Sequence, residues 1–475
     1  MSRGIHPGLA LLSIRRQNSV RSPPPTLAEL RAPICRETHT VEKQMALRPK
    51  SGATRVVVFI ASAAASFAWL GIAALAQPGG NGLLALTALP AAQTHTAGQF
   101  ALKDGDRVVF YGDSITEQRL YTTYVEHYCI THYPDRRITF INTGWGGDKV
   151  TANDCQPCAG VGGLARIKRD LLDHHPTVVT LLFGMNDGQY QDFDPAKMKV
   201  YQDGLRAIIA EIKSKTQARI YVMTPTVYDG TRHTPWSKTD KYNDVLDRYS
   251  EAAQQIASAE GLPLIDLHAV TTAALNRAKQ QNTSYTFLPD GVHPAEDGQL
   301  VMAAAMLRAW GAPIQGYVVH ARVSPVADTS SVSIMAPLPW PSPLPSDTIA
   351  KTYPDIIGEG TVIAQLTGLG QGRYTVNVDG KDVGQYSADA IAEGLPVGRV
   401  SAQAVAASDQ LASLIRKRAD LYFFRWRQVD LPYSKDYETA APAAQALDAL
   451  IEEMRNRARS IGAFHKYEIR ITPVR

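Results

Sequence analysis

Short apolar runs alternate with longer amphipathic stretches through the central part of the chain. The five runs are RVVFY at 107–111, RITFIN at 137–142, TVVTLLF at 177–183, RIYVMT at 219–224 and LPLIDL at 262–267. Each run is continuously apolar, as expected for a strand whose two faces are both covered in a parallel sheet. Helix-length segments such as MKVYQDGLRAIIAEIKS lie between the runs. This repetition predicts a three-layer α/β/α sandwich around a five-stranded parallel sheet, with right-handed crossovers.

Polar clusters follow four of these strands. They are GDS at 112–114, GWGGD at 144–148, GMND at 184–187 and DGVH at 290–293. The carboxyl ends of parallel strands meet at one edge of the sheet, which is where α/β proteins hold their reactive sites. The topology is therefore expected to bring the four clusters together, although tens of residues separate them.

The residue types in these clusters suit nucleophilic catalysis. Ser114, read alone, is a helix N-cap at the point where a strand gives way to a helix. A serine hydroxyl becomes a nucleophile when a positioned base removes its proton, and His293 is a candidate base. Asp290, three residues earlier, is placed to fix the imidazole tautomer and to stabilise its cation. Asp113 is expected to stabilise the turn rather than to react.

The four clusters, in this order and each after a strand, resemble the blocks of the SGNH/GDSL hydrolase superfamily. The resemblance covers residues 104–312. It implies a flavodoxin-like fold and a serine esterase that needs no metal or organic cofactor. It further implies catalytic roles for Ser114, Asp290 and His293, and an oxyanion hole made by the Ser114 and Gly147 backbone N–H groups and the Asn186 side-chain amide. Gly146 is the alternative to Gly147, one residue away.

The charge of the chain is concentrated in its first part. Between Met1 and Arg55 there are ten Lys/Arg against three Asp/Glu, a net charge of +7. Because the whole chain carries +4 and residues 56–76 are uncharged, the remainder carries −3. The slightly acidic body gives no indication of nucleic-acid binding.

The uncharged segment 56–76 follows basic residues and ends in Ala74-Leu75-Ala76, the order of a secretory signal. We expect cleavage after Ala76, translation from Met45, and a secreted or periplasmic protein. The alternative is a membrane anchor, because about twenty apolar residues can span a bilayer.

The expected division is a leader with signal peptide or anchor at 1–76, a linker at 77–103, the hydrolase domain at 104–315, a Pro-rich connector at 316–355 and an α+β extension at 356–475. In the extension, Asp379-Gly380 predicts a hairpin, and helices are expected at 402–418 and 438–459. The extension is either a structural addition or a lid or substrate platform. The side chains that would serve a platform are Tyr422, Phe424, Trp426 and the neighbouring arginines.

Once the leader is removed, three cysteines remain: Cys129, Cys155 and Cys158. Nothing completes a zinc site around Cys155 and Cys158, so a local disulfide or free thiols are expected. The pairing stays open, and so does the oligomeric state.

The expected substrate is a short-chain ester, chiefly acetyl, carried on a glycan or a small molecule. An exported esterase encounters glycans outside the cell. Aromatic and polar side chains on the loops are also typical of sugar-binding sites; these are Trp145, Tyr228, His233 and Trp236. The alternative is that these side chains only pack the loops. Lipase, lysophospholipase and thioesterase activities also occur in the superfamily. A carbohydrate-binding or scaffolding protein on an inactive hydrolase fold is the non-enzymatic alternative.

Overall fold

The computed structural model describes residues 100–151, 161–232, 234, 237–313, 316–324, 329–358, 361–434 and 436–474. The expected leader and most of the linker lie outside the described residues, as do Cys155, Cys158, His233 and Trp236. Cys129 is buried and unpaired. Among the described helices, none combines the length and apolar character needed to cross a membrane.

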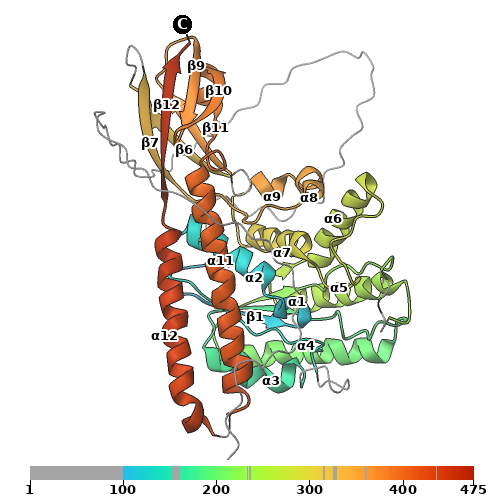
Figure 1. The fold of residues 1–475 in the computed structure, drawn as a ribbon. Coiled ribbons are helices and arrows are strands. Elements are labelled where there is room, and N and C mark those ends of the chain that lie inside the picture. Colours follow the sequence, from blue (N-terminus) through green and yellow to red (C-terminus); the bar gives the residue numbers. More distant parts are fainter. Residues whose placement is uncertain are drawn as a thin grey trace, which may run out of the picture. The chain divides into compact units, whose positions relative to one another are not determined.

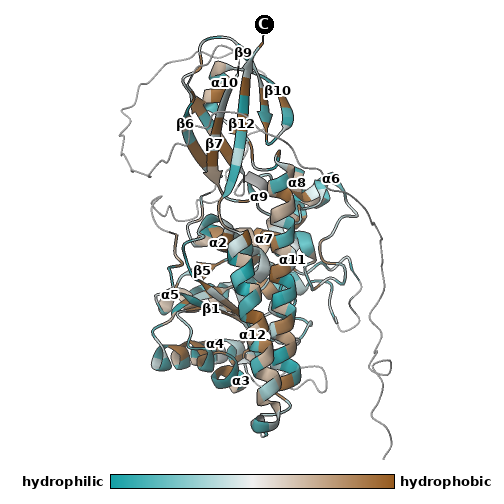
Figure 2. Ribbon diagram, turned by 60° about the vertical axis from the view of Figure 1, so that its left-hand side comes forward, coloured by the Kyte–Doolittle hydropathy of each residue, from teal (hydrophilic) through white to brown (hydrophobic). Residues whose placement is uncertain are grey.

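The central sheet is all-parallel, with strand order β2-β1-β3-β4-β5. Its strands are β1 (Arg107–Gly112), β2 (Thr139–Asn142), β3 (Val178–Leu182), β4 (Arg219–Met223) and β5 (Leu264–Ile265). Figure 2 shows these strands as hydrophobic, because both faces of the sheet are covered. The five-stranded parallel sheet and its flavodoxin-like order are confirmed.

Helices cover both faces of this sheet (Figure 1). They are α1 (Ser114–Glu117), α2 (Leu120–His132), α3 (Gly163–Asp170), α4 (Pro195–Lys215), α5 (Tyr242–Ala259), α6 (Leu267–Gln281) and α7 (Glu296–Ala309), with a 3₁₀ turn at Leu172–His174. Helix α3 contacts α4, and α4 contacts α5, whereas α2 packs on α7. This three-layer part, residues 100–312, is called the α/β domain below.

The strands that follow residue 312 form a β unit with a second hydrophobic core. One sheet has the order β10-β9-β12-β7 and the other β11-β8-β6. The strands are β6 (Tyr317–Arg322), β7 (Ser330–Ala336), β8 (Val362–Thr367), β9 (Arg373–Val378), β10 (Lys381–Ser387), β11 (Leu395–Pro396) and β12 (His465–Pro473). Three short helices accompany them: α8 (Asp347–Thr352), α9 (Asp355–Gly358) and α10 (Ala388–Glu393). The expected hairpin at Asp379-Gly380 is present between β9 and β10.

The prediction of a connector over 316–355 is wrong for the parts of that range that form strands and helices. Strands β6 and β7 lie within it, and β7 alternates buried and exposed side chains as a half-covered antiparallel strand does. Among the described residues, the Pro-rich part between β7 and α8, residues 337–346, has no regular structure. It is packed rather than free, since Trp340 is fully buried and its Nε1 donates to the Tyr124 carbonyl at 2.9 Å.

Two long helices are inserted between β11 and β12. They are α11 (Ala402–Phe424) and α12 (Tyr437–Ile461), and a π-helical turn at Arg425–Asp430 follows α11 directly. We call residues 402–461 the helical hairpin. Helix α11 runs beyond the expected end at 418 because the aromatic LYFF segment continues its helix.

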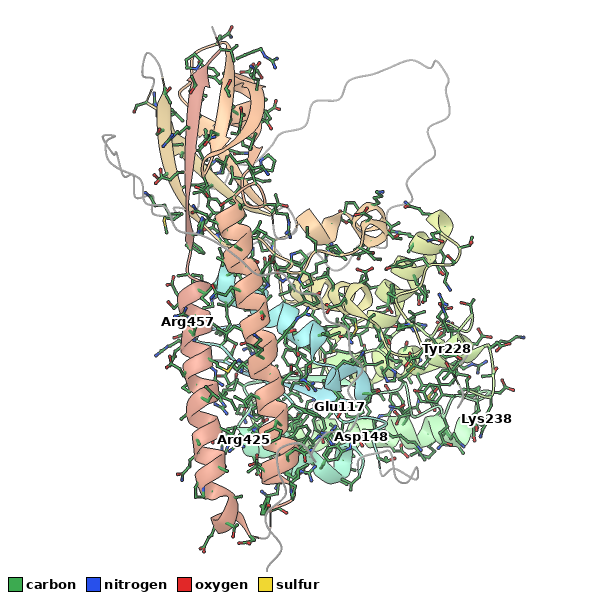
Figure 3. All side chains as sticks on the ribbon, viewed as in Figure 1. Glu117, Asp148, Tyr228, Lys238, Arg425 and Arg457 are labelled. Carbon is green, nitrogen blue, oxygen red and sulfur yellow. The ribbon has the colours of Figure 1, made fainter. Side chains whose placement is uncertain are left out.

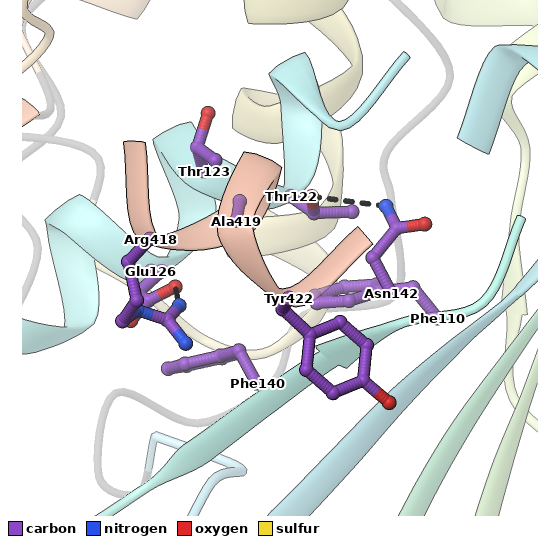
Figure 4. A pocket seen from close by; sticks show the side chains of 9 residues that line it. All are labelled: Phe110, Thr122, Thr123, Glu126, Phe140, Asn142, Arg418, Ala419 and Tyr422. Atoms are coloured by element: carbon purple, nitrogen blue, oxygen red, sulfur yellow. Dashed lines mark hydrogen bonds and ion pairs between the residues drawn. The ribbon is translucent and has the colours of Figure 1, made fainter. Parts of the chain in front are cut away.

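The hairpin packs on the α/β domain through α11 and α2. Arg418 pairs with Glu126 of α2, and the two side chains are only 4% and 5% exposed. Figure 4 shows this pair on the wall of a cavity of about 20 Å³ between α11 and the first strands. Arg416 also forms a bidentate salt bridge with Glu296, in which both N–O distances are 2.8 Å. The hairpin therefore explains why α2 is buried on almost all sides.

A buried carboxyl group marks the junction of β1 and α1. Asp113 is the N-cap of α1, and its Oδ1 accepts a hydrogen bond from the Ile115 N–H at 2.9 Å. Burial raises the pKa of Asp113 to about 8, and the carboxylates of Asp187 and Asp148 add to this effect. Its Oδ2 has no hydrogen-bond partner among the described residues. The protonated form of Asp113 is therefore favoured in the folded protein at neutral pH.

Asp113→Asn is expected to flatten the dependence of stability on pH. The folded state holds a proton on Asp113 that the unfolded chain releases near pH 4, so the contribution of Asp113 to stability falls as pH rises from about 4 to about 8. The slope from this group is at most about 1.4 kcal/mol per pH unit. Asn keeps the oxygen that caps α1 but does not titrate.

Denaturant unfolding of both proteins at about pH 5 and about pH 8 measures this difference. The variant should gain stability relative to the wild type at the higher pH. Equal changes in the two proteins would show that folded Asp113 is ionised.

Candidate active site

The side chains of Ser114, His293 and Asp290 form one chain of hydrogen bonds. His293 Nε2 lies 2.8 Å from Ser114 Oγ. His293 Nδ1 lies 2.6 Å from Asp290 Oδ2. Since Asp113 caps α1 and Ser114 is the first helical residue, the N-cap interpretation of Ser114 is wrong. The Ser114 hydroxyl is left free to bond to the imidazole.

Asp290 is held as a carboxylate. Burial alone raises the pKa of Asp290, but hydrogen bonds from the backbone N–H and the imidazole of His293 outweigh this effect and lower it below its ordinary value. The Val292 N–H donates to the same oxygen as the His293 N–H, at 3.0 and 2.8 Å. An ionised Asp290 favours the His293 tautomer with its proton on Nδ1, which leaves Nε2 as the acceptor facing Ser114.

The loop that carries Asp290 and His293 is braced from a neighbouring loop. Thr234 Oγ1 donates to the Asp290 carbonyl at 2.7 Å. The Asp229 N–H donates to the Gly291 carbonyl at 2.8 Å. Gly291 has a φ of +85°, a conformation that favours glycine at this turn. These contacts fix the direction of the His293 ring.

Residues 144–148, called the glycine loop below, turn back over the start of α1. The Trp145 N–H donates to the carbonyl of Gly112 at the end of β1, at 3.0 Å. A Cβ atom on Gly144 would lie 2.2 Å from the backbone N of Glu117, so only glycine allows this approach. Gly147 has a φ of +74°. The oxyanion role of Gly147, with Gly146 as the alternative, stays a prediction.

A buried arginine ties the glycine loop to the sheet. The Arg166 side chain is fully buried, and its Nε donates to Asp148 at 2.5 Å. Its other nitrogens donate to the carbonyls of Thr143 and Gly112, at 2.6 and 2.8 Å. No sequence motif pointed to Arg166, because these acceptors come together only through folding.

Asn186 faces the glycine loop. Its Nδ2 donates to the Asp148 carbonyl at 3.0 Å, and its Oδ1 accepts from the Tyr190 hydroxyl at 2.9 Å. An amide nitrogen carries two N–H donors, and the Asp148 carbonyl takes one. The neighbouring Asp187 accepts from the backbone N–H groups of Val150 and Gly184, both at 3.0 Å. The Asp148 carbonyl, which can only accept, fixes which end of the amide is nitrogen, and Tyr190, which sequence reasoning missed, holds the other end.

The aromatic side chains expected to line the substrate site are placed differently. Tyr228 is 2% exposed and packs edge-on against Tyr242 in the core, so its assignment to substrate binding is wrong. Figure 3 shows it well away from Glu117 and Asp148. The Trp145 ring packs against the helical hairpin, with the Arg427 guanidinium carbon 3.3 Å from its centroid. Its role in substrate binding stays a prediction.

A cavity of about 320 Å³ lies beside Asp187. Polar side chains predominate in its lining, including Lys149, Thr151, Gln189 and Lys197. Within the described ranges, no three His, Cys, Asp or Glu side chains are grouped so that they could hold a metal ion.

Comparison with known proteins shows what the chain is similar to. The model of the GDSL-like Lipase/Acylhydrolase family matches residues 110–301. An acetylxylan esterase of Geobacillus stearothermophilus is 27% identical over 229 residues, which make up 44% of this chain and 94% of that protein.

Two solved structures are among those similar to this chain. A gut microbial diltiazem-metabolizing enzyme superposes with a TM-score of 0.64 at 21% identity, covering 79% of this chain and 100% of that one. At this identity the likeness shows a shared fold alone. The crystal structure of an acetylxylan esterase from Geobacillus stearothermophilus covers 44% of this chain and 96% of its own, at 25% identity and a TM-score of 0.34.

The family match spans all four sequence blocks and confirms the resemblance on which the expected fold and chemistry were based. Residues 110–301 thus form a domain of the GDSL-like Lipase/Acylhydrolase family, within the SGNH/GDSL hydrolase superfamily, and this domain and the acetylxylan esterase relative support a carboxylic ester hydrolase.

Proposed function

We propose that the protein is an exported serine esterase that removes short acyl groups, chiefly acetyl, from carbohydrate esters through an acyl-enzyme on Ser114. The observation that carries the mechanism is the hydrogen-bonded chain Ser114–His293–Asp290, with distances of 2.8 and 2.6 Å. Each distance lies within the reach needed for proton transfer or imidazole orientation.

In the first step, His293 Nε2 takes the proton of the Ser114 hydroxyl while Oγ attacks the ester carbonyl carbon. Asp290 stabilises the imidazolium that forms. The carbonyl oxygen becomes an oxyanion, which the Ser114 and Gly147 N–H groups and the second N–H of Asn186 stabilise. Loss of one such donor typically lowers the rate by about 100- to 1,000-fold.

Collapse of this intermediate breaks the bond to the alcohol oxygen, and His293 returns the proton to the departing alcohol. A water molecule then attacks the acyl group on Ser114, with His293 again as the base. The carboxylic acid leaves, and the Ser114 hydroxyl is regenerated.

One observation supports a carbohydrate ester. The relative that is 27% identical over most of its own length is an acetylxylan esterase. Burial of Tyr228 removes one of the aromatic side chains that the sequence offered for sugar binding.

Lipase, lysophospholipase or thioesterase activity is the alternative within the same mechanism. A binding or scaffolding protein on an inactive fold is the alternative outside it. The aligned serine, histidine and aspartate argue against the second alternative, because binding alone does not require them.

Ser114→Ala is expected to lower ester hydrolysis by at least about 1,000-fold and to abolish labelling by an organophosphate, because the attacking oxygen is gone. His293→Ala should act nearly as strongly. Asp290→Ala should be milder, because Asp290 orients the imidazole rather than reacting. Hydrolysis of p-nitrophenyl acetate measures all three.

Ser284→Ala is the matched control, since Ser284 is exposed and its hydroxyl donates to the Asn282 side chain. Substantial hydrolysis by a folded Ser114→Ala protein would remove Ser114 from the mechanism.

A panel of acyl lengths from acetyl to palmitoyl tests the acyl group, and acetylated xylan, pectin and simple acetylated sugars test the alcohol. We expect acetyl esters to be hydrolysed fastest and acetate to be released from at least one glycan. A preference for chains of about eight carbons or longer, with no acetate released, would place the enzyme with the lipases and thioesterases.

Export is expected to leave a mature protein that begins at Gln77, because residues 56–76 have the order of a signal peptide. N-terminal sequencing of the exported protein measures this. A protein that keeps residues 56–76 and sediments with membranes would be anchored instead.

A further inference from the structure

The π-helical turn of the helical hairpin lies against the glycine loop. The guanidinium of Arg427 stacks on Trp145, with its carbon 3.3 Å from the ring centroid. Trp426 meets the same ring edge-on, with centroids 5.5 Å apart. One Arg427 nitrogen also lies 3.5 Å from the Gly144 carbonyl. A segment far along the chain thus covers the loop that leads to Gly147.

Arg427 also binds the helix that carries Ser114. Its Nη2 donates to Glu117 Oε1 at 2.7 Å, and the two side chains are 14% and 25% exposed. Glu117 lies three residues after Ser114 in α1. A Cβ atom on Gly146 would lie 2.7 Å from Glu117 Oε2, so the Glu117 carboxylate is packed against the glycine loop. Arg427 therefore holds Glu117 in place between α1 and the loop.

A second contact fixes the other side of the loop. Trp426 Nε1 donates to Asp170 Oδ1 at 3.1 Å, and Trp426 is 3% exposed. Asp170 also pairs with Arg166, which holds Asp148 at the end of the glycine loop. The π-helical turn thus reaches the loop through Trp145 at one end and through Asp148 at the other.

We propose that Arg427 of the helical hairpin is a positioning residue for ester hydrolysis. By binding Glu117 and Trp145, Arg427 holds the glycine loop so that the backbone N–H of Gly147 faces the developing oxyanion. The proposal rests on the serine-esterase mechanism above. It assigns to the hairpin a part in the reaction, although the hairpin lies outside the family domain at 110–301.

The chemistry of Arg427 suits this task. A guanidinium is planar, so it can stack on an indole and still donate in its plane to a carboxylate, whereas a lysine ammonium cannot do both. Burial lowers the pKa of Arg427 to about 10, which leaves it charged at neutral pH. π-Helical turns are rare and frequently occur at functional sites. Here the turn places Trp426 and Arg427 on the same loop.

The test compares Arg427→Met with Arg425→Met. Arg425 lies in the same π-helical turn, but its partners are Asp430 and Asp448 within the hairpin, so it is a matched control for loss of a hairpin arginine. For Arg427→Met we expect kcat for p-nitrophenyl acetate to fall about 10- to 100-fold with KM nearly unchanged, because a small displacement of a donor acts mainly on the transition state. Arg425→Met should keep kcat within about twofold.

Two further measurements separate positioning from stability. Inhibition by a boronic acid, which forms a tetrahedral adduct with Ser114, should weaken in Arg427→Met by about the same factor as kcat/KM. Arg427→Lys should recover only part of kcat. Glu117→Gln combined with Arg427→Met should be little worse than Arg427→Met alone, because the two residues act through one contact.

The proposal is overturned if Arg427→Met keeps kcat within about twofold, or if Arg425→Met loses as much kcat as Arg427→Met. These results leave the esterase mechanism standing, provided that the wild type is active and Ser114→Ala is not. A wild type that hydrolyses no ester would overturn both, since no oxyanion would then form.

Discussion

The Arg166 guanidinium is buried at the point where the ends of two strands and the glycine loop meet. It donates to the carbonyl of Gly112 at the end of β1 and to that of Thr143 just after β2. Asp148 pairs with Arg166 and balances its charge. Burial raises the pKa of Asp148, and Arg166 opposes this rise. Breaking such a buried pair from one side typically destabilises a protein by about 3–5 kcal/mol. Ser114 follows β1 and Gly147 follows β2, so the separation between Ser114 and Gly147 depends on Arg166.

The helices of the α/β domain leave part of the surface of α2 to be covered by other elements. Glu126 of α2 is buried only because Arg418 of the helical hairpin covers and neutralises it. Trp340, from the Pro-rich segment, fills a further part of the surface of α2. The same hairpin that covers α2 continues into the π-helical turn that meets Glu117 and Trp145. The helical hairpin therefore both covers the core and contacts the candidate site. From the sequence, a structural extension and a functional extension were alternatives.

The parallel sheet and the grouping of Ser114, His293 and Asp290 could be predicted because they follow from local patterns. Continuous apolar runs specify buried strands, and the sheet topology brings their carboxyl ends together. Arg166, Tyr190 and Arg427 could not be predicted, since each acts through partners that only folding brings near.

The errors have the same origin. Tyr228 follows a strand like the other loop residues, but its ring turns into the core. The prolines near Trp340 hid the alternating pattern of β7, which was present in SSVSIMA. The helix N-cap was assigned to Ser114 one residue too late, because Asp113 satisfies the same preference.

The central claim is that the reaction passes through an ester bond to Ser114. It is tested most directly by mixing the enzyme with an acetyl ester, quenching with acid within one turnover, and mapping any acetylated peptide by mass spectrometry. The account predicts an acetyl group on Ser114 that accumulates before acid quenching and disappears as free acetate is released. Acetylation at another residue, or turnover with no covalent intermediate on Ser114 at any time, would contradict it.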